Sequence, residues 1–150
     1  MSPPQTNPRQ PLIAAWGAQM IGTIVIAIVV LAFVRSLGGL LSNQAQDFQR
    51  YAMVGILVAA TPALYYLRTF KTSLKADEAA LVERNGLPDP KARAAMTRSL
   101  AIGGVLCELP MAAGVINLML GGDTRWFVGA TFITVAIRLS YRPFLSRSGR

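Results

Sequence analysis

A single acidic residue, Glu108, lies inside an otherwise uncharged apolar run that extends from residue 99 to residue 120. A carboxylate at bilayer depth is costly to insert, so an ionisable residue in such a run is a functional-site hypothesis by default. Two kinds of chemistry are open to it. Glu108 can bind a proton or cation, or it can pair with an opposite charge.

An opposite charge is expected at the same depth. Glu108 precedes Gly121 by 13 residues, and Arg138 follows Arg125 by 13 residues. In an antiparallel helical hairpin that turns at Asp123, both charges would lie about 20 Å below the turn, at about 1.5 Å per residue. The spacing therefore predicts opposite charges at one depth on neighbouring helices.

The segment that carries Arg138 has a polar stripe, because Thr131, Thr134, Arg138 and Tyr141 share one helical face. Three interpretations stay open from spacing alone. Glu108 and Arg138 form a buried pair that keeps the carboxylate ionised and sets the register of the hairpin. Alternatively, Arg138 extends to the inner headgroups and leaves Glu108 free to take up and release protons or cations. The third interpretation is a packing or ligand contact.

The chain has no histidine and only one cysteine, Cys107. Histidine metal sites, histidine-ligated haem and histidine-dependent nucleophiles are therefore excluded. An intrachain disulfide and a CxxC redox pair are excluded as well. We expect Cys107 to be a small buried apolar residue. The sequence predicts no cofactor, no metal and no enzymatic activity.

The composition is that of an integral membrane protein. Hydrophobic residues make up 53% and charged residues 15% of the 150 residues, and the mean hydropathy is +0.42. Soluble domains have about 45–50% apolar and about 25% charged residues. Residues 12–34 contain no charge, and about 20 apolar residues suffice to cross a bilayer.

The net charge of +8 is distributed unevenly along the chain. Of the fifteen Lys and Arg residues, one lies in the N-terminal tail, seven lie in residues 68–98 and four lie from Arg138 onward. Such a bias marks cytoplasmic segments. We expect a multi-pass protein of the bacterial inner (plasma) membrane, with both termini in the cytoplasm. Its basic residues would face anionic lipid headgroups, and no nucleic acid is expected.

The predicted fold class is all-α, an integral membrane four-helix bundle in a domain of residues 12–144. The spans are expected at residues 12–34, 51–67, 99–120 and 126–141. Helices two and three should extend into the cytoplasm as a hairpin over residues 68–98, because apolar residues continue at helical spacing to about Arg84. Asn85-Gly86 predicts the helix end, and Asp89-Pro90 predicts an N-cap followed by the next helix.

The remaining segments are predicted to be irregular. Residues 1–11 hold four prolines and are expected to form a flexible tail, and residues 145–150 a basic tail. Residues 35–50 are interpreted as an outer connector, with a helix in the membrane interface as the alternative.

Small residues and prolines predict packing contacts and kinks. Gly104 and Ala112 share a face with Glu108, and small residues let another helix approach closely. Pro110 lacks an N–H and predicts a kink one turn from the carboxylate, and Pro62 predicts another in the second span.

The segment Gly104-Val-Leu-Cys-Glu-Leu-Pro-Met-Ala-Ala-Gly-Val115 resembles the carboxylate helix of the proteolipid (c) subunit of rotary ATP synthases. That helix carries a mid-membrane acid, often followed two positions later by proline, and is entered from a cytoplasmic polar loop, as residues 86–98 precede it here. The resemblance implies that Glu108 binds a proton. The whole chain is also similar to small uncharacterised four-span bacterial membrane proteins with an acid in the third helix, a resemblance that implies no activity.

Two functions are therefore expected. The first is that of a non-enzymatic accessory or assembly subunit of a larger membrane complex, with a protein partner or as a homo-oligomer, in which Glu108 pairs with Arg138. The alternative is proton or cation translocation through a protonatable Glu108.

Overall fold

In the computed structural model, which describes residues 9–37 and 45–143, every regular element is a helix. The all-α prediction is confirmed for these residues. The helices are α1 (Gln10–Leu37), α2 (Ala45–Glu83), α3 (Pro90–Cys107), α4 (Leu109–Met119) and α5 (Thr124–Ser140).

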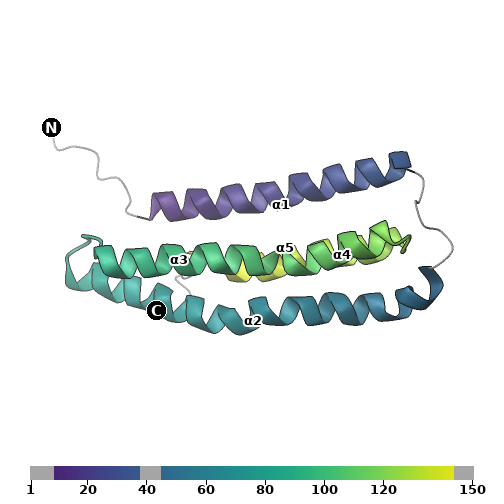
Figure 1. Cartoon of the computed structure of the whole chain (residues 1–150). Helices are drawn as coiled ribbons and strands as arrows, with labels where there is room; N and C mark the ends of the chain where they lie inside the picture. Colours follow the sequence, from purple (N-terminus) through teal and green to yellow (C-terminus); the bar gives the residue numbers. More distant parts are fainter. Residues whose placement is uncertain (1–8, 38–44, 144–150) are drawn as a thin grey trace, which may run out of the picture.

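The helices form three layers of nearly parallel or antiparallel rods (Figure 1). α3, α4 and α5 make the middle layer, with α1 along one side of it and α2 along the other (Figure 1). The α2–α3 turn lies at one end of the molecule and the α4–α5 turn at the opposite end. α5 ends short of the α2–α3 turn, so the tips of α2 and α3 extend beyond it (Figure 1).

The α2–α3 hairpin forms where the sequence predicts it. α2 ends at Glu83, Asn85 and Gly86 follow with positive φ angles of 51° and 89°, and the Gly86 N–H donates to the Leu81 carbonyl at 2.8 Å. This pattern closes a helix C-terminus. Asp89 caps α3 by accepting a hydrogen bond from the Ala92 N–H at 3.0 Å.

Polar contacts fix the register of this hairpin beyond the end of α5. Arg93 Nε lies 3.1 Å from Asp77 Oδ1, and the Asp77 side chain is only 2% exposed. The hydroxyls of Ser73 and Ser99 are 3.0 Å apart. From the first contact to the second, α2 advances from Ser73 to Asp77 while α3 runs back from Ser99 to Arg93. The two helices are therefore antiparallel and in contact.

The predicted third helix of residues 90–120 is interrupted at one residue. α3 ends at Cys107 and α4 begins at Leu109, with Glu108 as the cap of both. The cause is Pro110, which has no N–H to donate to the carbonyl four residues earlier. The Glu108 N–H instead donates to the Val105 carbonyl at 3.1 Å, and regular bonding resumes from the Ala112 N–H to the Glu108 carbonyl at 2.9 Å.

Three helices in the described residues are long and apolar enough to cross a membrane: Gln10–Phe33, Tyr51–Glu83 and Pro90–Met119. The α3–α4 pair counts as one of them. α5 has 17 residues, so it is about 25 Å long at about 1.5 Å per residue, against a hydrocarbon core of about 30 Å. The fourth span therefore stays a prediction.

The predicted N-terminal tail and the predicted connector of residues 35–50 are both partly helical in the structure. α1 begins at Gln10, inside the predicted tail, and α2 begins at Ala45, inside the predicted connector. Arg9, directly before α1, pairs with Glu78 of α2 at 3.0 Å, so the start of α1 flanks the middle of the hairpin arm. Residues 1–8, 38–44 and the basic tail 145–150 lie outside the described residues.

The larger core cluster lies between α2 and the middle layer, and a smaller one joins α1, α4 and α5. The rings of Phe70 and Tyr141 contact at a centroid distance of 4.9 Å, and both residues are about 1% exposed. Met96 and Cys107 of α3 are fully buried in the same cluster. This cluster anchors the end of α5 against α2 and α3, and thereby places Arg138 three residues earlier.

Candidate functional site

The site is centred on the guanidinium of Arg138, whose side chain is 4% exposed. Its Nη2 atom donates to Glu108 Oε1 at 2.7 Å and to the Gly104 carbonyl at 2.8 Å. Its Nη1 atom donates to Thr23 Oγ1 at 2.6 Å and to the Gln19 carbonyl. Four N–H groups of one arginine therefore join three segments, which are α1, the α3–α4 interruption and α5.

Thr23 links the two charges to α1. Its hydroxyl accepts from Arg138 Nη1 and lies 2.7 Å from Glu108 Oε1 and 3.0 Å from the Gln19 carbonyl. A hydroxyl has one hydrogen to donate, so it donates to either Glu108 or Gln19 at a given time. The shorter distance and the charge of the acceptor favour the Glu108 carboxylate.

A further bond attaches α1 at its first turns. Trp16 Nε1 donates to the Arg138 carbonyl at 3.1 Å. Trp16, Gln19 and Thr23 follow one another at spacings of three and four residues, so they share one face of α1. We name the junction formed by Trp16, Gln19, Thr23, Gly104, Glu108 and Arg138 the arginine junction.

The contribution of α1 is what sequence reasoning missed. The sequence of α1 does indicate such a contact. Within residues 12–34 the side chains that can form hydrogen bonds are those of Trp16, Gln19 and Thr23, and all three lie on one face. Polar side chains in an apolar helix commonly bond to a neighbouring helix. Reading only the third and fourth spans left this face unassigned.

Gly104 allows α1 to approach α3 closely. A Cβ atom at Gly104 would lie 2.7 Å from Gln19 Oε1, which is closer than real contacts allow. The same residue supplies the carbonyl that Arg138 binds. Gly104 therefore lies at a helix contact, whereas Ala112, two helical turns later, is exposed and outside the arginine junction.

The other predicted site residues are dispersed. Thr131 donates to the Phe127 carbonyl of its own helix at 3.0 Å and does not reach Glu108. Thr134 is fully buried, and its hydroxyl has no hydrogen-bond partner among the described residues. Pro62 is exposed and lies within α2, which continues through it. The polar stripe on α5 thus contributes only Arg138 to the junction.

Two buried atoms of the charge pair keep unused bonding capacity within the described part of the chain. Glu108 Oε2 and Arg138 Nε are buried without a hydrogen-bond partner there. The Glu108 side chain as a whole is 33% exposed, although its Oε2 atom is buried. The two charged groups therefore make several hydrogen bonds but not all that they could make. Removing one partner of a buried pair is costly, because it leaves the other charge buried alone.

Residues 9–37 and 45–143 contain no group of three or more His, Cys, Asp or Glu side chains that could hold a metal ion. Cys107, next to Glu108, is fully buried in the core cluster, as the sequence predicts. The chemistry available in this arrangement is charge pairing, hydrogen bonding between helices and proton exchange at one carboxylate.

No protein-family model matches the chain, and neither a curated protein nor a solved structure does so.

Proposed function

We propose that this chain is a non-enzymatic integral membrane protein and an accessory or assembly subunit of a larger membrane complex. It would cross the bacterial inner membrane four times, with both termini and the tip of the α2–α3 hairpin in the cytoplasm. Three long apolar helices and the positive charge of residues 68–98 support this topology. α5 would complete the fourth span as the antiparallel partner of α4.

The observation that carries the proposal is the ion pair between Glu108 Oε1 and Arg138 Nη2 at 2.7 Å. The carboxylate is neutralised within the same chain, and its partner is bound to α1 as well. Such a pair suits a residue that fixes helix positions better than one that binds a substrate. Between helices in lipid there is no hydrophobic driving force, so polar contacts of this kind determine which helices associate.

Exposed apolar residues at the hairpin tip supply a surface for a partner. Val82 is 80% exposed and Leu87 is 69% exposed, next to the turn and outside the apolar part of the helices. Isolated exposed apolar residues are ordinary, but two beside one projecting turn are a candidate contact for another subunit or a second copy of this chain.

The base of the hairpin carries positive charge on one face. Arg68, Lys71 and Lys75 follow helical spacing on α2 and are all exposed. They lie one to three turns beyond Tyr65, which is 86% exposed and suited to the membrane interface. This face is proposed to contact anionic lipid headgroups.

The experiment is purification of the tagged chain from its native membrane in mild detergent or native nanodiscs, at several expression levels. The expected result is a defined oligomer or a co-purifying subunit in fixed ratio. Leu87→Asp should weaken that association, while Asn85→Asp, in the same turn, should not. A monodisperse monomer without partners at every expression level contradicts the accessory role.

Proton or cation translocation through Glu108 is the second candidate, favoured by the buried Oε2 atom without a partner. Carbodiimides react with protonated carboxyl groups in apolar surroundings. The ion pair predicts little reaction of the wild-type protein near neutral pH. Fast reaction that disappears in Glu108→Gln would favour translocation over the structural role.

A further inference from the structure

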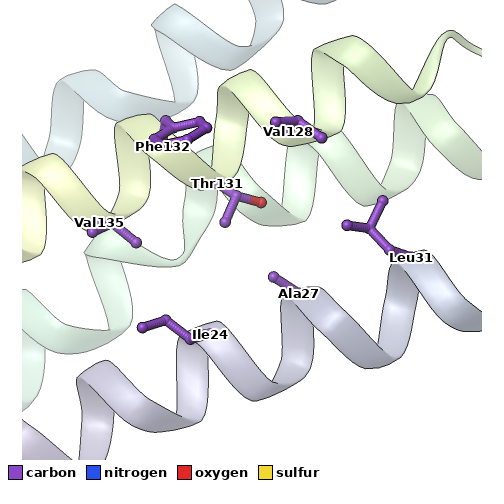
Figure 2. A pocket seen from close by; sticks show the side chains of 7 residues that line it. All are labelled: Ile24, Ala27, Leu31, Val128, Thr131, Phe132 and Val135. Atoms are coloured by element: carbon purple, nitrogen blue, oxygen red, sulfur yellow. The ribbon is translucent and has the colours of Figure 1, made fainter.

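An apolar groove of about 290 Å³ lies between α1 and α5. Ile24, Ala27 and Leu31 line it from α1, and Val128, Thr131, Phe132 and Val135 line it from α5 (Figure 2). Ala27 and Thr131 face one another across the gap (Figure 2). The groove lies between the arginine junction and the α4–α5 turn.

The lining offers a polar ligand no free donor and only the acceptor lone pairs of one hydroxyl. Thr131 is the one residue in the lining with a polar side chain, and its hydroxyl already donates to the Phe127 carbonyl at 3.0 Å. Small polar molecules would therefore lose their hydrogen bonds to water on entering. The occupant must be apolar over the whole length of the groove.

The size of the groove distinguishes among apolar occupants. An α-helix with its side chains is about 10–12 Å across, so another helix could insert only side chains into this volume and not its backbone. A volume of 290 Å³ is that of roughly ten water-sized groups, at about 30 Å³ each. A single hydrocarbon chain of about ten carbon atoms fits this space. Contacts with the branched side chains of the lining offset the entropy lost when the chain is ordered.

A positive charge lies at one end of the groove. Arg125 precedes Val128 by three residues and Phe132 by seven, on the same side of α5. Its side chain is 92% exposed, and its Nε atom is 3.9 Å from Asp123 Oδ2, an exposed contact that leaves the guanidinium available. An arginine at this position can bind a phosphate in the headgroup region.

We propose that the groove binds one acyl chain of a glycerophospholipid whose phosphate is held by Arg125. The bound lipid would fill the gap between α1 and α5 that the protein leaves open, and would support α1 in the half of the bilayer that the arginine junction does not reach. The inference rests on the proposed membrane insertion, but not on the accessory role.

The first test uses Phe132→Trp, since Phe132 lines the groove and is 71% exposed, so the substitution should not disturb packing. The purified variant is delipidated in detergent and titrated with a phospholipid whose acyl chains carry bromine, which quenches tryptophan fluorescence. The expected result is quenching that saturates at one lipid per chain. The two native tryptophans are quenched as well, so their quenching is measured in the protein without the substitution and subtracted.

Matched variants identify the site. Thr131→Phe should fill the groove and abolish the saturable phase, whereas Ala136→Phe, exposed on the same helix, should leave it unchanged. Arg125→Gln should weaken binding about fivefold, the equivalent of about 1 kcal/mol for one arginine near an anionic group. A brominated free fatty acid should bind more weakly than the phospholipid.

Three results would overturn the inference. Quenching that rises in proportion to the lipid fraction without saturating would mean ordinary solvation by lipid. Saturable quenching that persists in Thr131→Phe would place the lipid elsewhere. Formation of a dimer that Thr131→Phe abolishes, seen by native mass spectrometry of the same samples, would assign the groove to a second copy of the chain. None of these results depends on whether a partner subunit co-purifies.

Discussion

α1 and α2 flank the same middle layer but are held to it by different forces. α1 buries few residues, among them Leu12, Thr23 and Ala27. α2 buries a series of side chains that includes Ile56, Ala60, Ala63, Phe70 and Leu74. α2 is held by packing along its length, whereas α1 makes fewer packing contacts, through Leu12 and Ala27, and depends more on the hydrogen bonds of the arginine junction.

This difference indicates which substitutions would weaken the attachment of each helix. Packing is spread over many small contacts, so the loss of one side chain weakens it in part. The arginine junction gathers most of the polar contacts of α1 around Arg138, so one substitution there can weaken several of them at once. In the proposed membrane setting, the apolar side chains of α1 would be equally well solvated by lipid when the helix detaches, so apolar burial would not hold it in place.

The largest effect is expected for Arg138→Met, which keeps the stem of the side chain and removes the charge. Glu108 would then lie unpaired beside α1, and removing one partner of a buried ion pair costs about 3–5 kcal/mol. We expect α1 to separate from α3 and α5, while α2 stays packed. The measurement is disulfide cross-linking between cysteines placed in α1 and α5, alongside thermal unfolding in detergent.

The double variant Glu108→Gln with Arg138→Met is the control for that experiment. It removes both charges, so it should recover part of the stability lost in the single variant. Equal instability of the single and double variants would mean that the loss comes from the missing bonds of Arg138 and not from the unpaired charge of Glu108.

The attachment of α2 is tested by Gly103→Ala. A Cβ atom at Gly103 would overlap the ring of Tyr141, in the core between α2, α3 and α5. Overpacking of this kind costs about 1–3 kcal/mol. Gly55→Ala, where nothing lies within 4 Å, is the matched control. A stability of Gly103→Ala equal to that of Gly55→Ala would show that this core is loosely packed.

Thr23→Val should weaken the junction without removing a charge. It eliminates the bonds to Glu108 and Arg138, at 2.7 and 2.6 Å, and leaves two charged groups with fewer partners. We expect a loss of about 1–3 kcal/mol and less cross-linking between α1 and α5. Thr72→Val, which removes only a bond to the Arg68 carbonyl of the same helix, should change neither quantity.

The smallest effect on stability is expected for Arg125→Gln. Arg125 and Asp123 are 3.9 Å apart with side chains 92% and 44% exposed, and such surface pairs contribute about 0–1 kcal/mol. Thermal unfolding should therefore be unchanged in delipidated protein. A clear loss of stability there would mean that Arg125 supports the fold directly, and would separate that role from lipid binding.

The sequence by itself determined the helical class, the apolar segments and the hairpin ends. Runs of apolar residues define helices that can cross a membrane whatever they pack against. The Asn85-Gly86 and Asp89-Pro90 signals act within a few residues, so they need no tertiary contact to end one helix and begin the next. Counting from the Asp123 turn also placed Glu108 and Arg138 at one depth, because the rise per residue of a helix is fixed.

Only the tertiary structure decided what those charges touch. Depth along a helix follows from counting, but the direction of a side chain around the helix axis matters only once the helices are packed. Arg138 and Thr131 share one face of α5, but Arg138 lies where α1 and α3 are in contact, whereas Thr131 lies about 10 Å closer to the α4–α5 turn, where the groove separates α1 from α5. Tyr141 packs directly against Gly103 and holds the end of α5 at this position, a contact between residues far apart in the sequence that no local pattern encodes.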